Sequence, residues 1–185
     1  MADTFSPTAP RVIVAGGINV DLVVAPTETL VRGTSNPGAI SIHAGGVARN
    51  IAEFLARLKV PVALVGRVGH EALSRWVVTA TKTAGVDVDG VDEGEGTVGF
   101  YVTIQEDGDL GTAISDLAAT ERITPDLLVS ALSRYGHPGR MCPEILVLDC
   151  NLLPETLQAA LSWANQRDVF VVVEPVSRHK ARRLV

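Results

Sequence analysis

The sequence predicts an α/β fold in which a mostly parallel sheet carries helices on both faces and a small β insertion. Short continuous apolar runs, typical of strands buried on both faces, occur at residues 12–15, 60–66, 145–149 and 169–173. Between them, apolar residues recur at the three- to four-residue spacing of helices. Two further stretches, about 22–44 and 97–116, alternate apolar and polar residues around turn residues, which predicts hairpins.

Composition narrows the class of protein. The 185 residues, 46% of them hydrophobic, suffice for one globular domain, and a net charge of −5 argues against nucleic acid as a partner. No apolar run approaches the roughly 18–20 residues of a membrane span, and residues 1–10 are predicted to be a polar, disordered tail. Cys142 and Cys150 form no C-x-x-C pair. We therefore expect a cytoplasmic protein without membrane partners.

The first strand ends in two glycines, and Asn19 and Asp21 follow it. Open α/β sheets bind their ligands at the carboxyl ends of their strands. An Asn side chain both donates and accepts hydrogen bonds, and an ionised Asp accepts from two neighbouring hydroxyls, which suits a vicinal diol. Because Asn-x-Asp is also a common turn, the residues alone leave both interpretations open.

Two hairpins are expected around the turn at residues 36–38 and the turn at residues 106–109. They could pair with each other as a small sheet, a lid, over the region that follows residue 44. The alternative is an ordinary antiparallel edge on the main sheet.

Gly45 and Gly46 lead into a predicted helix over residues 51–58. Adjacent glycines allow a close backbone approach or a positive φ, and the helix directs its unpaired N–H groups at the same place. Asn50, in the first turn, can donate and accept hydrogen bonds there. Glycines that serve packing alone are the alternative. The residues expected on the buried face of the helix are Val47, Ile51, Phe54, Leu55 and Leu58.

Helices are also predicted over residues 70–84, 125–135 and 154–166. Trp76 is expected in the core. The predicted strand at 145–149 brings Asp149, Cys150 and Asn151 to the same edge of the sheet as Asn19. Asn151 is the candidate for a ligand contact there, and Asp149 could instead cap a helix or turn.

The stretch 45–52 (Gly-Gly-Val-Ala-Arg-Asn-Ile-Ala), with Gly66 and Gly69 beyond it, resembles the N-terminal signature of the ribokinase-type (PfkB) carbohydrate kinases. Within that family it looks most like the pseudouridine kinases. Two residues depart from the pattern: Ala48 stands where Gly is usual, and Lys59 stands where the helix ends in Gly or Ser. A left-handed non-glycine residue at that end costs about 1 kcal/mol, so we expect the helix to end differently at Lys59.

The resemblance implies a ribokinase-like three-layer fold, with a β-lid that closes on the sugar and often forms the interface of a homodimer. It implies ATP and Mg²⁺ as cofactors and phosphoryl transfer to a sugar or nucleoside hydroxyl, here the 5′-hydroxyl of pseudouridine. It places Glu174 on the side of the nucleotide phosphates and Mg²⁺, which a carboxylate would hold through water, although a solvated strand-end Glu remains the alternative. The sugar-binding positions that it implies are Asn19, Asp21, Gly45, Gly46, Asn50 and Asn151.

The family's Gly-Ala-Gly-Asp motif, which stabilises the migrating phosphoryl group and supplies the catalytic base, does not occur in these residues. The resemblance covers residues 11–185, about the first three-fifths of a family member. We therefore expect a fragment of a longer kinase, inactive alone, or a truncated, non-catalytic module that binds a sugar or nucleoside. A nucleotide-dependent oxidoreductase is disfavoured because no G-x-G-x-x-G fingerprint is present.

Overall fold

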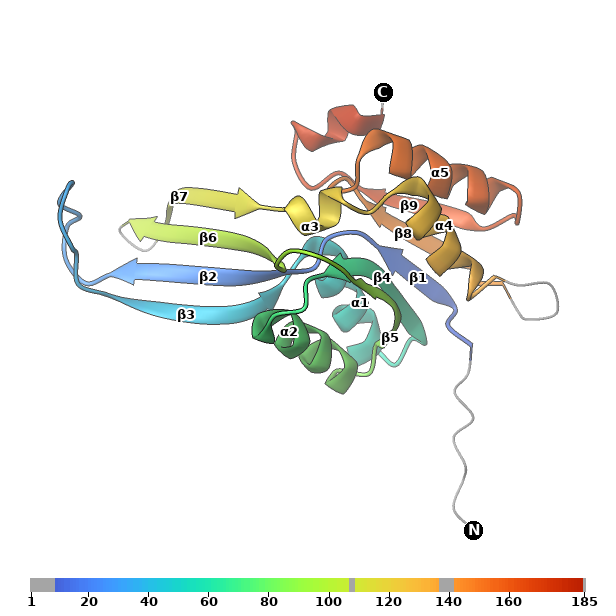
Figure 1. The fold of residues 1–185 in the computed structure, drawn as a ribbon, viewed down its shortest axis with the longest axis horizontal. Coiled ribbons are helices and arrows are strands. Elements are labelled where there is room, and N and C mark those ends of the chain that lie inside the picture. Colours follow the sequence, from blue (N-terminus) through green and yellow to red (C-terminus); the bar gives the residue numbers. More distant parts are fainter. Residues whose placement is uncertain (1–8, 107–108, 137–141, 185) are drawn as a thin grey trace, which may run out of the picture.

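A computed structural model describes residues 9–106, 109–136 and 142–184. It contains two separate sheets, and the smaller sheet projects from the larger, helix-covered one (Figure 1). Most of the expected N-terminal tail and the centre of the expected turn at residues 106–109 lie outside the described residues.

The main sheet is fully parallel, with strand order β5-β4-β1-β8-β9. Its strands are β1 (Val12–Ala15), β4 (Val62–Val68), β5 (Asp87–Glu93), β8 (Ile145–Asp149) and β9 (Phe170–Glu174). Because all five run the same way, their carboxyl ends share one edge of the sheet. Strand β5 was not predicted, since as an edge strand it carries alternating acidic residues and no apolar run.

Helices cover both faces of the main sheet, and the side chains of β1 show why. Val12 and Val14 belong to the apolar cluster beneath α1 (Val47–Arg57) and α2 (Ala72–Thr83). Ile13 and Ala15 belong to the cluster beneath α4 (Pro125–Ser133) and α5 (Pro154–Asn165). The predicted three-layer α/β fold is therefore confirmed. Two short helices, α3 (Ala118–Glu121) and the 3-10 helix η1 (Lys180–Leu184), complete the described elements.

The second sheet has the strand order β3-β2-β6-β7, so the two hairpins do not extend the main sheet. Its strands are β2 (Asn19–Pro26), β3 (Gly38–Gly45), β6 (Gly99–Glu106) and β7 (Asp109–Asp116). Strands β2 and β6 pair in parallel, and both hairpins are antiparallel.

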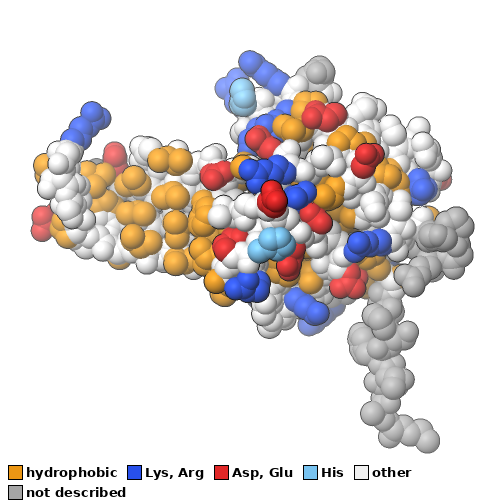
Figure 2. Space-filling model, viewed as in Figure 1, with side chains coloured by type: hydrophobic (Ala, Val, Ile, Leu, Met, Phe, Trp, Pro, Cys, Tyr) orange, Lys and Arg blue, Asp and Glu red, His pale blue; other side chains and the backbone are white. Residues whose placement is uncertain are grey.

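One face of the second sheet is apolar across all four strands. The register places Ile42, Leu22, Val102 and Ile114 in a single row. Ile42 and Ile114 are exposed, and Figure 2 shows hydrophobic side chains along this projecting part of the molecule.

Helix α1 buries only part of the predicted face: Ile51 and Leu55 are partly buried and pack against the core. Phe54 is 63% exposed and Leu58 is 60% exposed, so their assignment to the core was wrong. The buried face carries Ala48, Ala52 and Ala56, whose small side chains let the helix lie close to the sheet. An apolar stripe chosen by side-chain size therefore extended beyond the buried face, whose centre is formed by the alanines.

Two other expectations about helices were wrong. Trp76 is 40% exposed, so its prediction as a core residue was wrong; Ser74, Val77 and Thr81 form the buried face of α2. The different helix ending expected from Lys59 was also wrong: Lys59 follows Leu58, the C-cap residue of α1, and is left-handed at φ 64°. In the described part of the chain, no helix is both long and apolar enough to cross a membrane.

Candidate functional site

Asp149, at the carboxyl end of β8, is a fully buried carboxylate that holds three segments together. It accepts N–H hydrogen bonds from Gly17, Ala48 and Asn151, each at 2.9 Å. Gly46, the N-cap residue of α1, has no side chain, so Asp149 caps this helix from a neighbouring strand. The interpretation of Asp149 as a cap is therefore the one that the structure supports.

Burial also affects how readily the Asp149 carboxyl ionises. Desolvation raises the pKa of the Asp149 carboxyl above its ordinary value, although the three N–H donors favour the ionised form.

The glycines before α1 are required by close contacts. Gly46 has φ 100°, and a Cβ on it would lie 2.3 Å from the carbonyl oxygen of Gly17. A Cβ on Gly45 would lie 2.2 Å from Oδ1 of Asp21. The two glycines thus allow the start of α1 to lie directly against the β1–β2 connection and the Asp21 side chain.

Asn19 and Asp21 are the first and third residues of β2, where the chain passes from the main sheet to the second sheet. Nδ2 of Asn19 donates to Oδ1 of Asp21 at 2.5 Å. In the β2–β3 pairing, Asn19 lies opposite Gly45. Burial raises the pKa of the Asp21 carboxyl, while the charge of Arg49 and the Asn19 hydrogen bond oppose that shift.

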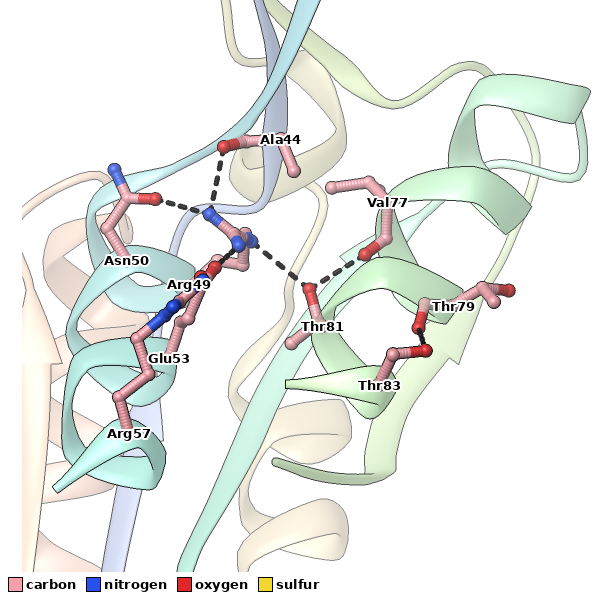
Figure 3. Close-up of polar contacts among 9 residues, drawn as sticks. All are labelled: Ala44, Arg49, Asn50, Glu53, Arg57, Val77, Thr79, Thr81 and Thr83. Atoms are coloured by element: carbon pink, nitrogen blue, oxygen red, sulfur yellow. Dashed lines mark hydrogen bonds and ion pairs between the residues drawn. The ribbon is translucent and has the colours of Figure 1, made fainter. Parts of the chain in front are cut away.

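Arg49, which sequence reasoning missed, links this region to α1 and α2 (Figure 3). It is only 5% exposed, and its Nη1 donates to the carbonyl oxygen of Ala44 at 2.8 Å and to Oδ1 of Asn50 at 2.6 Å. Its Nε donates to Oγ1 of Thr81 at 3.1 Å, and it forms an ion pair with Glu53. The i,i+4 spacing of Arg49 and Glu53 was the signal available in the sequence.

Asn151 is buried beside the β1–β2 connection, and its Nδ2 would lie 3.0 Å from a Cβ on Gly17. Nζ of Lys180, from η1, donates to Oδ1 of Asn151 at 2.5 Å. Burial and the neighbouring charge of Arg183 lower the pKa of Lys180. Arg183 fixes η1 in place by donating to the carbonyl oxygens of residues 150, 151 and 152.

Glu174 ends β9, paired in register with Asp149. Its Oε2 accepts a hydrogen bond from the N–H of Val176 at 2.7 Å. Val176 has φ 62°, an unfavourable conformation for a β-branched residue. The backbone of Glu174 therefore lies beside the segment that contains Asp149 and Asn151, and its carboxylate closes the turn to Val176.

The predicted site residues thus fall into connected groups. Asn19, Asp21 and the two glycines lie together, and Arg49 joins Asn50 to them. Asn151 and Glu174 approach from the adjacent strand ends. Amide and carboxylate groups in this arrangement can exchange several hydrogen bonds with a polyhydroxylated ligand.

Solved structures of similar shape define the class of protein. A carbohydrate kinase from Agrobacterium tumefaciens superposes with a TM-score of 0.80 at 26% identity, over 95% of this chain and 56% of that one. A ribokinase of Arabidopsis thaliana, complexed with ribose and ATP, has the same fold, with a TM-score of 0.75 at 22% identity over 90% of this chain and 53% of that one. The fold is therefore that of the ribokinase-like carbohydrate kinases.

Sequence comparison narrows this class to a family. Residues 9–185 match the model of the pfkB family carbohydrate kinases, and the chain belongs to that family, as its glycine signature predicted. It is 33% identical over 173 residues to the pseudouridine kinase of Escherichia coli K12, covering 91% of this chain and 52% of that one. It is 32% identical over 174 residues to the uncharacterized sugar kinase YeiI of the same organism, covering 93% and 46%. The chain thus spans about half the length of these sugar and nucleoside kinases.

Proposed function

We propose that this protein is an ATP-dependent kinase that phosphorylates the 5′-hydroxyl of pseudouridine, and that this chain binds the nucleoside. The observation that carries the proposal is the Asn19–Asp21 pair, which lies against Gly45 where the two sheets join. One oxygen of Asp21 accepts from Asn19, and a carboxylate retains further acceptor capacity for neighbouring ribose hydroxyls.

The same proposal assigns Asn50 and Asn151 to the sugar, and Gly45 and Gly46 to the close approach of the backbone. The choice of pseudouridine is supported by the similarity to the pseudouridine kinases of Escherichia coli K12 and Arabidopsis thaliana, which are 33% and 25% identical to this chain. Ribose, fructose and other nucleosides are the competing substrates.

Glu174 is the residue that we assign to Mg²⁺ and the nucleotide phosphates. Mg²⁺ in phosphoryl-transfer sites takes one or two carboxylates and fills its remaining positions with water and phosphate oxygens. The described residues hold no cluster of three or more His, Cys, Asp or Glu, and a single carboxylate at a strand end fits that mode of binding. ATP would supply the phosphoryl group, while the residues of this chain hold and orient the acceptor hydroxyl.

We further propose that two copies associate through the apolar face of the second sheet. Four large apolar side chains of this sheet are at least half exposed: Ile40, Ile42, Leu110 and Ile114. Three of them, Ile40, Ile42 and Ile114, lie on the face that carries the aligned apolar row. An apolar surface of this kind marks an interaction site. The cytoplasm is the compartment that an ATP-dependent kinase of this class implies.

An ADP-release assay on the protein purified from the cell that makes it tests the function. Pseudouridine, uridine, adenosine, ribose and fructose are compared as acceptors. The highest kcat/KM for pseudouridine is expected. A preference for another acceptor would overturn the substrate assignment, and ADP release with none of them would overturn the kinase assignment in favour of a binding module.

A further inference from the structure

Three amide side chains of the candidate site each contact a charged side chain that fixes which way the amide faces. Nδ2 of Asn19 donates to Asp21, Oδ1 of Asn50 accepts from Arg49, and Oδ1 of Asn151 accepts from Lys180. An ionised carboxylate only accepts hydrogen bonds, whereas guanidinium and ammonium groups only donate them. Each charged neighbour therefore decides whether the outer end of its amide is a donor or an acceptor.

We propose that Arg49 is a positioning residue that turns the Asn50 amide so that Asn50 donates a hydrogen bond to an oxygen of the substrate. The inference rests on the proposed function, because it names the polarity of one contact in the same site. Its ligand group is an oxygen acceptor of the sugar, a hydroxyl or the ring oxygen.

The guanidinium of Arg49 is itself held from three elements, so its position does not depend on Asn50. It donates to Ala44 at the end of β3 and to Thr81 of α2, and it pairs with Glu53 one turn along α1. Thr81 in turn donates to the carbonyl oxygen of Val77 at 2.7 Å, as Figure 3 shows. A buried, fully engaged cation of this kind is a rigid support for a neighbouring amide.

Asn50 is the member of the pair that a ligand can reach. Arg49 is buried, whereas Asn50 is exposed and borders a surface hollow that His43 and Phe54 also line. In Figure 3 its nitrogen points away from the guanidinium. The group offered to a ligand in this hollow is therefore an NH₂ with two donors.

The decisive variant is Asn50→Asp, which preserves the shape of the side chain and its acceptor for Arg49. It replaces the outward donor with an acceptor, so affinity for pseudouridine, measured by isothermal titration with the 185-residue chain, is expected to fall by at least about tenfold. Its stability in urea is expected to be unchanged or higher, because the hydrogen bond from Arg49 becomes an ion pair between a guanidinium and a carboxylate. Asn50→Ala is expected to weaken binding less than Asn50→Asp, since it adds no repelling oxygen. Asn165→Asp, an exposed change of the same kind on α5, is the control and keeps wild-type affinity.

A second set of variants tests Arg49. Arg49→Met is expected to weaken pseudouridine binding in the wild-type background but to add little loss in the Asn50→Ala background, because its effect passes through Asn50. Arg49→Lys, which can still donate to Oδ1 of Asn50, is expected to recover part of the affinity. If Arg49→Met does not fold, the Asn50→Asp result decides.

Two results would overturn the inference alone: wild-type affinity in Asn50→Asp, or equal losses from Arg49→Met in both backgrounds. If the wild-type chain bound none of pseudouridine, uridine and ribose, the proposed sugar site would fail and the inference would fail with it. The two failures are distinguishable because only the second removes wild-type binding.

Discussion

Gly46→Ala should be among the most destabilising single-methyl changes in this chain, because two separate effects meet at that position. Gly46 has φ 100°, where an L-residue costs about 1–2 kcal/mol. The added Cβ would also lie 2.3 Å from the carbonyl oxygen of Gly17 and 2.7 Å from Cα of Ile18. Those atoms belong to the backbone that Asp149 fixes, so relief requires a shift of the β1–β2 connection, at about 1–3 kcal/mol. The expected total loss is about 2–5 kcal/mol.

Gly85→Ala separates the two effects. Gly85 has φ 98°, but a Cβ there would meet only the Cβ of Ala56, at 3.8 Å. Gly85→Ala should therefore lose only the conformational part, and the restriction of the unfolded chain is the same in both variants. Urea unfolding followed by circular dichroism gives both losses. Equal stability of Gly46→Ala and Gly85→Ala would refute the claim that packing at the start of α1 requires this glycine.

Three further predictions follow from the structure. Affinity for pseudouridine should fall as the pH drops through the pKa of Asp21, which burial raises above its ordinary value, because the protonated carboxyl loses an acceptor. Binding titrations at several pH values should show this fall in the wild type. The same fall in Asp21→Asn would contradict its assignment to Asp21. Lys59→Gly should raise the free energy of unfolding by about 1 kcal/mol, because Lys59 is left-handed at φ 64°. A loss of stability in urea would show instead that the Lys59 side chain contributes more than its backbone strain costs. Ile42→Asp should shift the sedimentation coefficient from that of a dimer to that of a monomer. Ser41→Asp, which lies on the other face of β3, should leave it unchanged. A wild-type protein that sediments as a monomer would exclude the proposed interface.

Local sequence was sufficient for the strands of the core and for the glycine turn. The runs at β1 and β8 are short, uniformly apolar and bounded by Gly or Asp, so their positions were predicted to the residue. Thr124 and Pro125 likewise marked the start of α4, where the Thr124 side chain accepts the N–H of Leu127. In these cases the determining interactions lie within a few residues of one another.

The rest depends on contacts that no local pattern contains. Asp149 acts on Gly17 and Ala48, which are 132 and 101 residues away, and Arg49 is positioned by Thr81, 32 residues away. Side-chain size misplaced Phe54, because α1 packs on the sheet through alanines. The family resemblance supplied the site positions, including Asp21, whereas Arg49 and Lys180, which orient the amides of Asn50 and Asn151, became evident only from the packing of α1, α2 and η1.

Titration of pseudouridine into the wild-type chain and into Asp21→Ala tests the central claim most directly. Asp21 is partly buried against Gly45, and removal of its carboxylate should leave the fold intact, as judged by circular dichroism, while binding is lost. Asp109→Ala, at the exposed start of β7, is the matched control and should bind as the wild type does. Saturable binding by the wild-type chain that disappears only in Asp21→Ala is the predicted result. Equal binding by all three proteins, or by none of them, would contradict the assignment of the sugar site.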